Sequence, residues 1–258
     1  MVKYKQGTDA LDVLNREDDG DKAKFSSFKS GDVHFIKVLG TSDLIQFFSY
    51  GIFGKVNSFV AANPSEKSAK GFPTDNHTPW DLAFKYHRDK SSDFNDKHGQ
   101  ESGKYKPKQR FAMGFYDLDS GEQIIVDVSR NQAQAIHGTV KKYKIKLGKL
   151  AFELTKEGSG TSTTVSLTPV LDFDEDLTDK QKENYSKSPG EFDMSLFDGI
   201  LYEAEEDEQI TLLNQAGFDV SLIGLEIPNK AEDGAAEDKR DDDEVETIQD
   251  IQDSELPF

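Results

Sequence analysis

The chain has 258 residues, of which 35 % are hydrophobic and 31 % are charged, and it contains no cysteine. Ordinary globular chains are about 45–50 % apolar, so part of this chain is not expected to pack into a core. Disulfide bonds and thiolate metal sites are excluded, and a chain without cysteine suits a reducing cytoplasm. No apolar run approaches the roughly 20 residues that span a bilayer, and the N-terminus lacks the apolar segment of a signal peptide. We therefore expect a soluble intracellular protein without a membrane partner.

The net charge of −18 is distributed unevenly along the chain. Residues 231–258 carry twelve acidic and two basic side chains, a net charge of −10, and residues 172–230 carry a net charge of −12. Residues 1–171 are left with a net charge of +4. A mildly basic body followed by an acidic rear is typical of a nucleic-acid-binding protein with an acidic tail.

The first half of the chain predicts an arm, a few strands and one helix. Residues 1–20 are polar and are interpreted as an N-terminal arm. Val33–Leu39 is an apolar run suited to a strand, and the aromatic-rich residues 44–60 follow it. A short helix is expected from Pro79 to about His87. Residues 89–103 are polar, show no periodicity and predict no element.

The clearest pattern is a pair of hairpins separated by a helix. Residues 110–118 and 123–128 are β-rich and flank a turn that contains Gly121. A helix is expected over residues 130–143, with a second hairpin over residues 151–169. Short strands, Gly-rich turns and one intervening helix favour a small Greek-key barrel, which we place at residues 21–171.

Beyond Leu171 the pattern changes from strands to helices. Leu177–Tyr185 and Leu201–Ala216 predict helices, the second ended by Gly217, so residues 172–230 are expected to form an acidic helical appendage. The charge density of residues 231–258 predicts disorder. The predicted fold is therefore mainly β with helical additions.

Basic and aromatic residues alternate through the predicted barrel. Single-stranded nucleic acid needs both, because cations follow the phosphates and flat rings stack on unpaired bases. The alternative is that the lysines are solvated and the rings fill the core, since only one face of a strand can meet DNA. The candidate phosphate-binding residues are Lys104, Lys106, Lys108, Arg110, Lys141, Lys142 and Lys144, and the candidate stacking residues are Trp80, Phe84, Tyr86, Tyr105, Phe111, Phe115 and Tyr116.

Catalytic and metal sites are not expected. The sequence has no Gly-rich phosphate loop, no nucleophile elbow and no His-Glu-x-x-His motif. His77, His87 and His98 lie within 22 residues, but their spacing matches no compact ligand motif and no thiolate is available. We predict a non-enzyme without metal or cofactor.

The acidic tail ends in Asp253-Ser254-Glu255-Leu256-Pro257-Phe258. Apolar residues at the end of an acidic segment can bind a shallow apolar pocket that is surrounded by Lys or Arg on another protein. The same segment can cover the protein's own basic groove and compete with nucleic acid. The third interpretation is a tail that only adds solubility.

Three segments resemble the single-stranded DNA-binding proteins of bacteriophages, in particular the helix-destabilising family of T-even phages. Residues 1–11 resemble that family's basic N-terminal arm, residues 106–116 its basic-aromatic strand, and residues 152–169 its late hairpin. The tail resembles the tips of bacterial and phage single-stranded DNA-binding proteins. The chain departs from the family by lacking the cysteines of its zinc subdomain, whose place would be the region from His77 to His98.

The resemblance implies an oligonucleotide/oligosaccharide-binding (OB) barrel that coats single-stranded DNA in phage replication, recombination and repair. It implies self-association on DNA through the arm residues Lys3, Tyr4 and Lys5. It also implies recruitment of phage polymerase and helicase or primase through the tail residues Asp253, Glu255, Leu256, Pro257 and Phe258, in the cytoplasm of an infected bacterial host. The main alternative is an acidic interaction protein or DNA mimic that binds a basic protein, and RNA binding shares every stacking argument.

Overall fold

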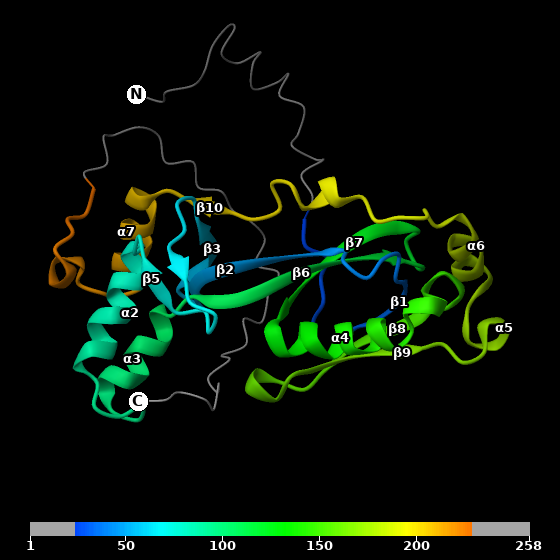
Figure 1. Ribbon diagram of the computed structural model, residues 1–258, viewed down its shortest axis with the longest axis horizontal. Coiled ribbons are helices and arrows are strands. Elements are labelled where there is room, and N and C mark those ends of the chain that lie inside the picture. Colours follow the sequence, from blue (N-terminus) through cyan, green and yellow to red (C-terminus); the bar gives the residue numbers. More distant parts are fainter. Residues whose placement is uncertain (1–23, 229–258) are drawn as a thin grey trace, which may run out of the picture.

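The computed structural model describes residues 24–228, and the predicted arm (residues 1–20) and acidic tail (residues 231–258) lie outside this range (Figure 1). The strands are β1 (Val33–Lys37), β2 (Leu44–Ile52), β3 (Val56–Ala61), β4 (Glu66–Lys67), β5 (Pro73–Asp75), β6 (Lys108–Asp117), β7 (Glu122–Ser129), β8 (Phe152–Glu157), β9 (Thr164–Pro169) and β10 (Glu203–Ala204). The helices are α2 (Pro79–Lys90), α3 (Lys97–Tyr105), α4 (Arg130–Lys142), α5 (Phe173–Asp176), α6 (Asp179–Lys187) and α7 (Glu206–Gln215).

The long strand β6 organises the sheet, because three strands pair with it. Its first half pairs with β2, from Lys108 opposite Ser49 to Met113 opposite Leu44. Its last two residues pair with β1 on the same edge, and β7 pairs with the other edge from Arg110 to Asp117. The main strand order is β10-β3-β2-β6-β1-β8-β9, and within residues 24–228 the eight-stranded sheet is not closed. The prediction of a mainly β chain with helical additions is confirmed.

Helix α4 covers the inner face of β6, β7 and β9, as its sequence predicts. Ser129 caps it in a capping box with Gln132, which satisfies backbone N–H groups at the first turn. Ala133, Ile136 and Val140 recur at helical spacing and are buried against the strands. This core also contains Phe115 and Phe152 among other apolar side chains, so its driving force is ordinary apolar burial.

A second lobe is inserted between β1 and β6. Figure 1 shows β2 and β6 running from this lobe, with α2 and α3, towards α4, β8 and β9. Pro79 at the first turn and the capping box of Thr78 with Asp81 fix the start of α2 where the sequence predicts it. Helix α3 lies in a stretch for which no element was predicted. Asp96 caps α3, and only Gly99 and Tyr105 are buried in it. Its sequence therefore has no apolar periodicity that would predict a helix.

Residues 172–228 return along the whole molecule. Helix α6 is bound to the β6–β7 turn, since Gln181 Nε2 donates to Asp119 Oδ1 at 2.7 Å and Asn184 Nδ2 donates to the carbonyl of Leu118 at 2.8 Å. The chain then crosses to β10, which pairs in parallel with β3, and α7 packs against α2 (Figure 1). The predicted helices correspond to α6 and α7, and Gly217 follows α7 with a φ of +96°. This segment is part of the sheet and of both lobes.

Candidate nucleic-acid interface

Five of the seven predicted stacking residues fill the cores. Tyr116 packs beside Leu118, Phe115 lies under α4, and the other three belong to the lobe of α2 and α3. Rings with almost no exposed surface cannot stack on a base, so for these residues the alternative interpretation as core side chains holds in this structure. The exposed fractions are 0 % for Trp80, 5 % for Phe84, 3 % for Tyr105, 2 % for Phe115 and 6 % for Tyr116.

The other two predicted rings, Tyr86 and Phe111, are partly exposed. Lys90 Nζ lies 3.8 Å from the centroid of the Tyr86 ring and donates to its hydroxyl at 2.6 Å. Phe111 packs at the rim of the α4 core, opposite the exposed Gln46 of β2. Both rings therefore keep some surface for a ligand.

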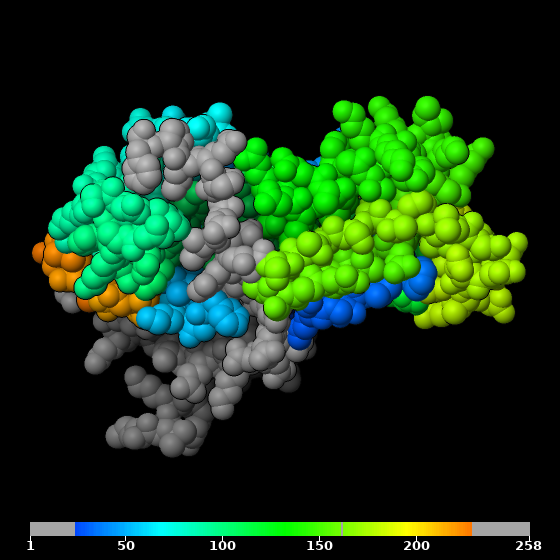
Figure 2. Space-filling model, turned by 90° about the horizontal axis from the view of Figure 1, so that it is seen from below, coloured from blue at the N-terminus to red at the C-terminus, as the bar shows by residue number. Residues whose placement is uncertain are grey.

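The predicted basic residues form two groups: Lys104, Lys106, Lys108 and Arg110 lie at the end of α3 and the start of β6, and Lys141, Lys142 and Lys144 lie at the end of α4. Arg110 is paired in register with Ser129, the residue that caps the start of α4, whereas Lys141 and Lys142 end the helix and Lys144 follows it. Thirteen helical residues rise about 20 Å, so the two ends of α4 lie about 20 Å apart. In Figure 2 the lobe of α2 and α3 and the lobe of α4, β8 and β9 lie on opposite sides of the molecule.

Within the first group, two cations already have acidic partners. Arg110 Nε donates to Asp127 Oδ1 at 2.9 Å, and Lys104 Nζ lies 2.7 Å from Glu101 Oε1. Lys106 lies over the aromatic ring of Phe72, with its Nζ 4.7 Å from the ring centroid.

Phe72 is the centre of a cation–aromatic cluster that the sequence did not predict. Arg88 Cζ also lies 4.7 Å from its centroid, and Phe84 stacks on it at 6.2 Å with an interplanar angle of 21°. Phe72 is partly exposed and comes from the turn before β5, Arg88 from α2 and Lys106 from the end of α3. We call Phe72, Phe84, Arg88 and Lys106 the Phe72 cluster.

A second cation–aromatic contact lies next to it in the chain. Lys67 Nζ is 5.5 Å from the centroid of Phe48 and 5.8 Å from that of Tyr50. Gly71 has a φ of +79°, and a Cβ there would lie 3.1 Å from Phe48 Cε1. The turn before Phe72 therefore passes directly over the Phe48 ring, and a glycine is needed for this approach.

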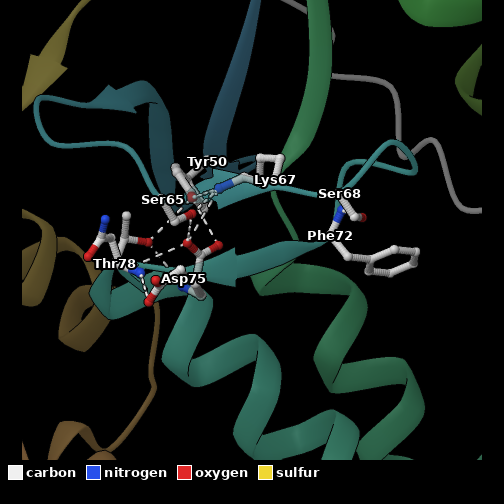
Figure 3. A network of polar contacts seen from close by, with 9 residues as sticks. Tyr50, Ser65, Lys67, Ser68, Phe72, Asp75 and Thr78 are labelled. Atoms are coloured by element: carbon white, nitrogen blue, oxygen red, sulfur yellow. Dashed lines mark hydrogen bonds and ion pairs between the residues drawn. The ribbon is translucent and has the colours of Figure 1, made fainter.

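A buried polar network holds Lys67 in place (Figure 3). The carboxylate of Asp81 is fully buried and accepts hydrogen bonds from Tyr50 at 2.9 Å, from the backbone N–H of Thr78 at 3.3 Å and from Ser65. Lys67 Nζ lies 3.4 Å from the same carboxylate and its side chain is 8 % exposed. Burial lowers the pKa of Lys67, against the opposing effect of Asp81, and burial raises the pKa of Tyr50. In Figure 3 the ring of Phe72 points away from this network.

The sequence signal for these residues was weak. Lys67 and Phe72 lie in a polar stretch rich in Gly, Pro, Ser and Asn, and neither belongs to a periodic pattern. Phe48 stands among five aromatic residues between positions 47 and 59, which are equally typical of a core. Lys67 and Phe72, which lie four residues before and one residue after Gly71, are the only local hint of a functional loop.

The histidines do not converge on a metal site within residues 24–228. His87 Nδ1 and His98 Nδ1 are 2.9 Å apart, and the His87 ring stacks on Tyr105 at 5.7 Å with an angle of 8°. Burial, and then His98, lower the pKa of His87. In this part of the chain no three His, Cys, Asp or Glu side chains are grouped as metal ligands. Over the same residues, no helix is both long enough and apolar enough to cross a membrane.

Comparison with protein-family models, with curated proteins and with solved structures finds no match for this chain.

Proposed function

We propose that this protein binds single-stranded DNA without catalysis, through a surface centred on the Phe72 cluster. The observation that carries the proposal is the pair of cations, Arg88 and Lys106, over a partly exposed ring. Unpaired bases stack on aromatic rings and on guanidinium planes, and neighbouring cations neutralise phosphates.

The strand order supports an OB-type core. The five strands β7-β6-β1-β8-β9 are adjacent in that order, and α4 connects β7 to β8. The OB fold is a five-stranded, partly open Greek-key barrel that binds oligonucleotides. An open edge between β7 and β9, bridged by α4, is compatible with such a barrel. The resemblance to phage proteins supplies the proposed setting, in which the protein coats DNA during phage replication, recombination and repair, in the host cytoplasm.

The two basic groups permit a track along the molecule. A strand that contacts Arg110 and continues along α4 would reach Lys141, Lys142 and Lys144 at the far end of a helix about 20 Å long. The exposed face of α4 between them carries Arg130, Gln134 and His137 and no acidic residue. Along α4 the track therefore meets no acidic side chain, although Asp127 lies beside Arg110 at its start.

The test is a fluorescence-anisotropy titration of the full chain with labelled oligo-dT, duplex DNA and oligo-rU at several salt concentrations. We expect oligo-dT to bind well ahead of duplex, with affinity falling steeply with salt. Arg88→Gln should weaken binding and reduce the slope of log affinity against log salt by about 0.7. Phe72→Leu should weaken binding by roughly 5- to 150-fold, since a stacked base contributes about 1–3 kcal/mol.

Lys187→Gln is the matched control, because Lys187 is exposed and paired with Glu183 on α6. It removes one positive charge away from the proposed surface and should leave binding unchanged. Equal binding by the parent, Arg88→Gln and Phe72→Leu would reject the Phe72 cluster as the site. No binding of any nucleic acid would reject the function and favour the acidic interaction protein.

A further inference from the structure

The outer face of β6 and β7 is covered by a segment of the chain's own rear. On this face lie Ala112 and Ile125, with Ile45 and Phe47 of β2 beside them. Residues 190–200, here called the strap, cross it and bury Phe192 and Phe197 on these side chains. In the proposed OB order, β6 and β7 are the second and third strands, whose face binds oligonucleotides.

Phe192 is seated against the backbone of β6. A Cβ at Gly114 would lie 2.3 Å from Phe192 Cζ, so the ring occupies the space that a side chain would fill. Phe197 packs beside it, with ring centroids 5.3 Å apart. Two neighbouring flat rings are the kind of group that a nucleic-acid-binding strand face accepts.

The strap is also negatively charged, as a nucleic acid is. Its sequence is Gly190-Glu191-Phe192-Asp193-Met194-Ser195-Leu196-Phe197-Asp198-Gly199-Ile200. Phe192 lies between two carboxylates and Phe197 precedes a third, and all three carboxylates are exposed. Flat rings and nearby negative charges are the features that the strap shares with a single strand of DNA.

The strap is attached mainly by side chains. The backbone N–H of Asp193 donates to Gln123 Oε1 at 2.7 Å, and the backbone hydrogen bonds of residues 194–200 close turns within the strap. Among the described residues, no backbone hydrogen bond joins the strap to β6 or β7. Sheet-type contacts resume at Tyr202, whose carbonyl accepts from the N–H of Val60 at 2.9 Å. Release of the strap would therefore leave the hydrogen-bonded pairing of the sheet strands intact.

We propose that the outer face of β6 and β7 is a second single-stranded-DNA subsite and that the strap is an internal competitor that occupies it. Binding of a long strand then releases the strap, whereas a short oligonucleotide binds the Phe72 cluster alone. This inference rests on the proposed function and adds a site and its regulation.

The test locks the strap in place. Because the chain has no cysteine, Gln123→Cys with Asp193→Cys provides the only two thiols, which a short bismaleimide can join. Oligo-dT of different lengths is titrated against the full chain before and after cross-linking. The control is Thr155→Cys with Ser166→Cys, which are cross-strand partners on β8 and β9 and do not involve the strap.

We expect cross-linking of the strap to weaken binding of long oligo-dT at least tenfold, with little effect on short oligomers and none in the control. Faster hydrogen exchange of residues 190–200 on addition of long oligo-dT to the parent would give the same conclusion. Equal affinity with the strap locked and unlocked, or unchanged exchange, would overturn the proposal. Absence of binding by the parent would instead be a failure of the proposed function.

Discussion

Trp80 Nε1 donates a hydrogen bond to the backbone carbonyl of Gln209 at 3.1 Å, which joins the start of α2 to α7. The indole has no exposed surface and contacts Tyr50, Phe59 and Tyr105 ring to ring. The single tryptophan of the chain is therefore a structural link between the inserted lobe and the returning rear of the chain.

Trp80→Phe should lower the free energy of unfolding by about 2 kcal/mol, because a buried hydrogen bond and packing volume are lost. The affinity for oligo-dT should stay within a factor of two of the parent. Chemical denaturation followed by circular dichroism measures the first quantity, and anisotropy the second. A tenfold loss of affinity in a folded Trp80→Phe protein would place Trp80 at the interface after all.

The network around Asp81 predicts unequal effects for its two charged members. Asp81→Asn leaves Lys67 without its buried counter-charge and should cost about 3 kcal/mol of stability. Lys67→Met should cost only about 1 kcal/mol, since Tyr50, Ser65 and Thr78 still donate to the carboxylate. Urea denaturation of both variants compares them, and a larger loss for Lys67→Met would contradict this account.

The elements with a strong periodic signal could be predicted from the sequence. The β6–β7 hairpin has alternation and a Gly-containing turn, and α4 has its capping box and apolar face. Helix α3 could not be predicted, because its packing depends on two residues and on Asp96 as a cap. The path of residues 188–204 could not be predicted either, since it is set by tertiary contacts of Phe192 and Phe197.

The candidate site was only partly predictable for the same reason. Composition indicates that cations and rings are abundant, but it cannot tell Trp80, which fills a core, from Phe72, which meets solvent. Both lie in the same lobe, and Phe84 contacts Phe72 from within that core. Whether a ring is buried or exposed depends on which strand and helix faces pack together. The sequence around the ring does not specify that packing.

The pair His34 and Asp117 predicts a pH-dependent stability. His34 Nδ1 lies 3.7 Å from Asp117 Oδ1, and this carboxylate raises the pKa of His34 although burial opposes it. Burial acts to raise the pKa of Asp117, but His34 and Ser120 outweigh it and lower that pKa. A raised histidine pKa stabilises the fold fully below the unfolded value of about 6.5, and the contribution is lost as pH rises through the folded value.

His34→Gln should therefore cost more stability at pH 5.5 than at pH 8.5, with a difference of about 0.5–1 kcal/mol. The cost should also shrink on acidification below about pH 4, where Asp117 begins to take up a proton. Denaturation of both proteins across this pH range gives the comparison. A pH-independent difference would show that the two groups do not interact electrostatically.

Gly114→Ala tests the packing of the strap directly. The new methyl group would lie 2.3 Å from Phe192 Cζ, so either β6 or the strap must move, and overpacking of this kind costs about 1–3 kcal/mol. The cost should be smaller when Phe192→Ala is already present, because the clashing ring is gone, and a double-mutant cycle measures this coupling.

If the strap competes with DNA, Gly114→Ala should also strengthen binding of long oligo-dT, since the displaced Phe192 ring no longer fills the outer face of β6 and β7. Stability and affinity both equal to those of the parent would show that Phe192 is not seated on Gly114 in solution.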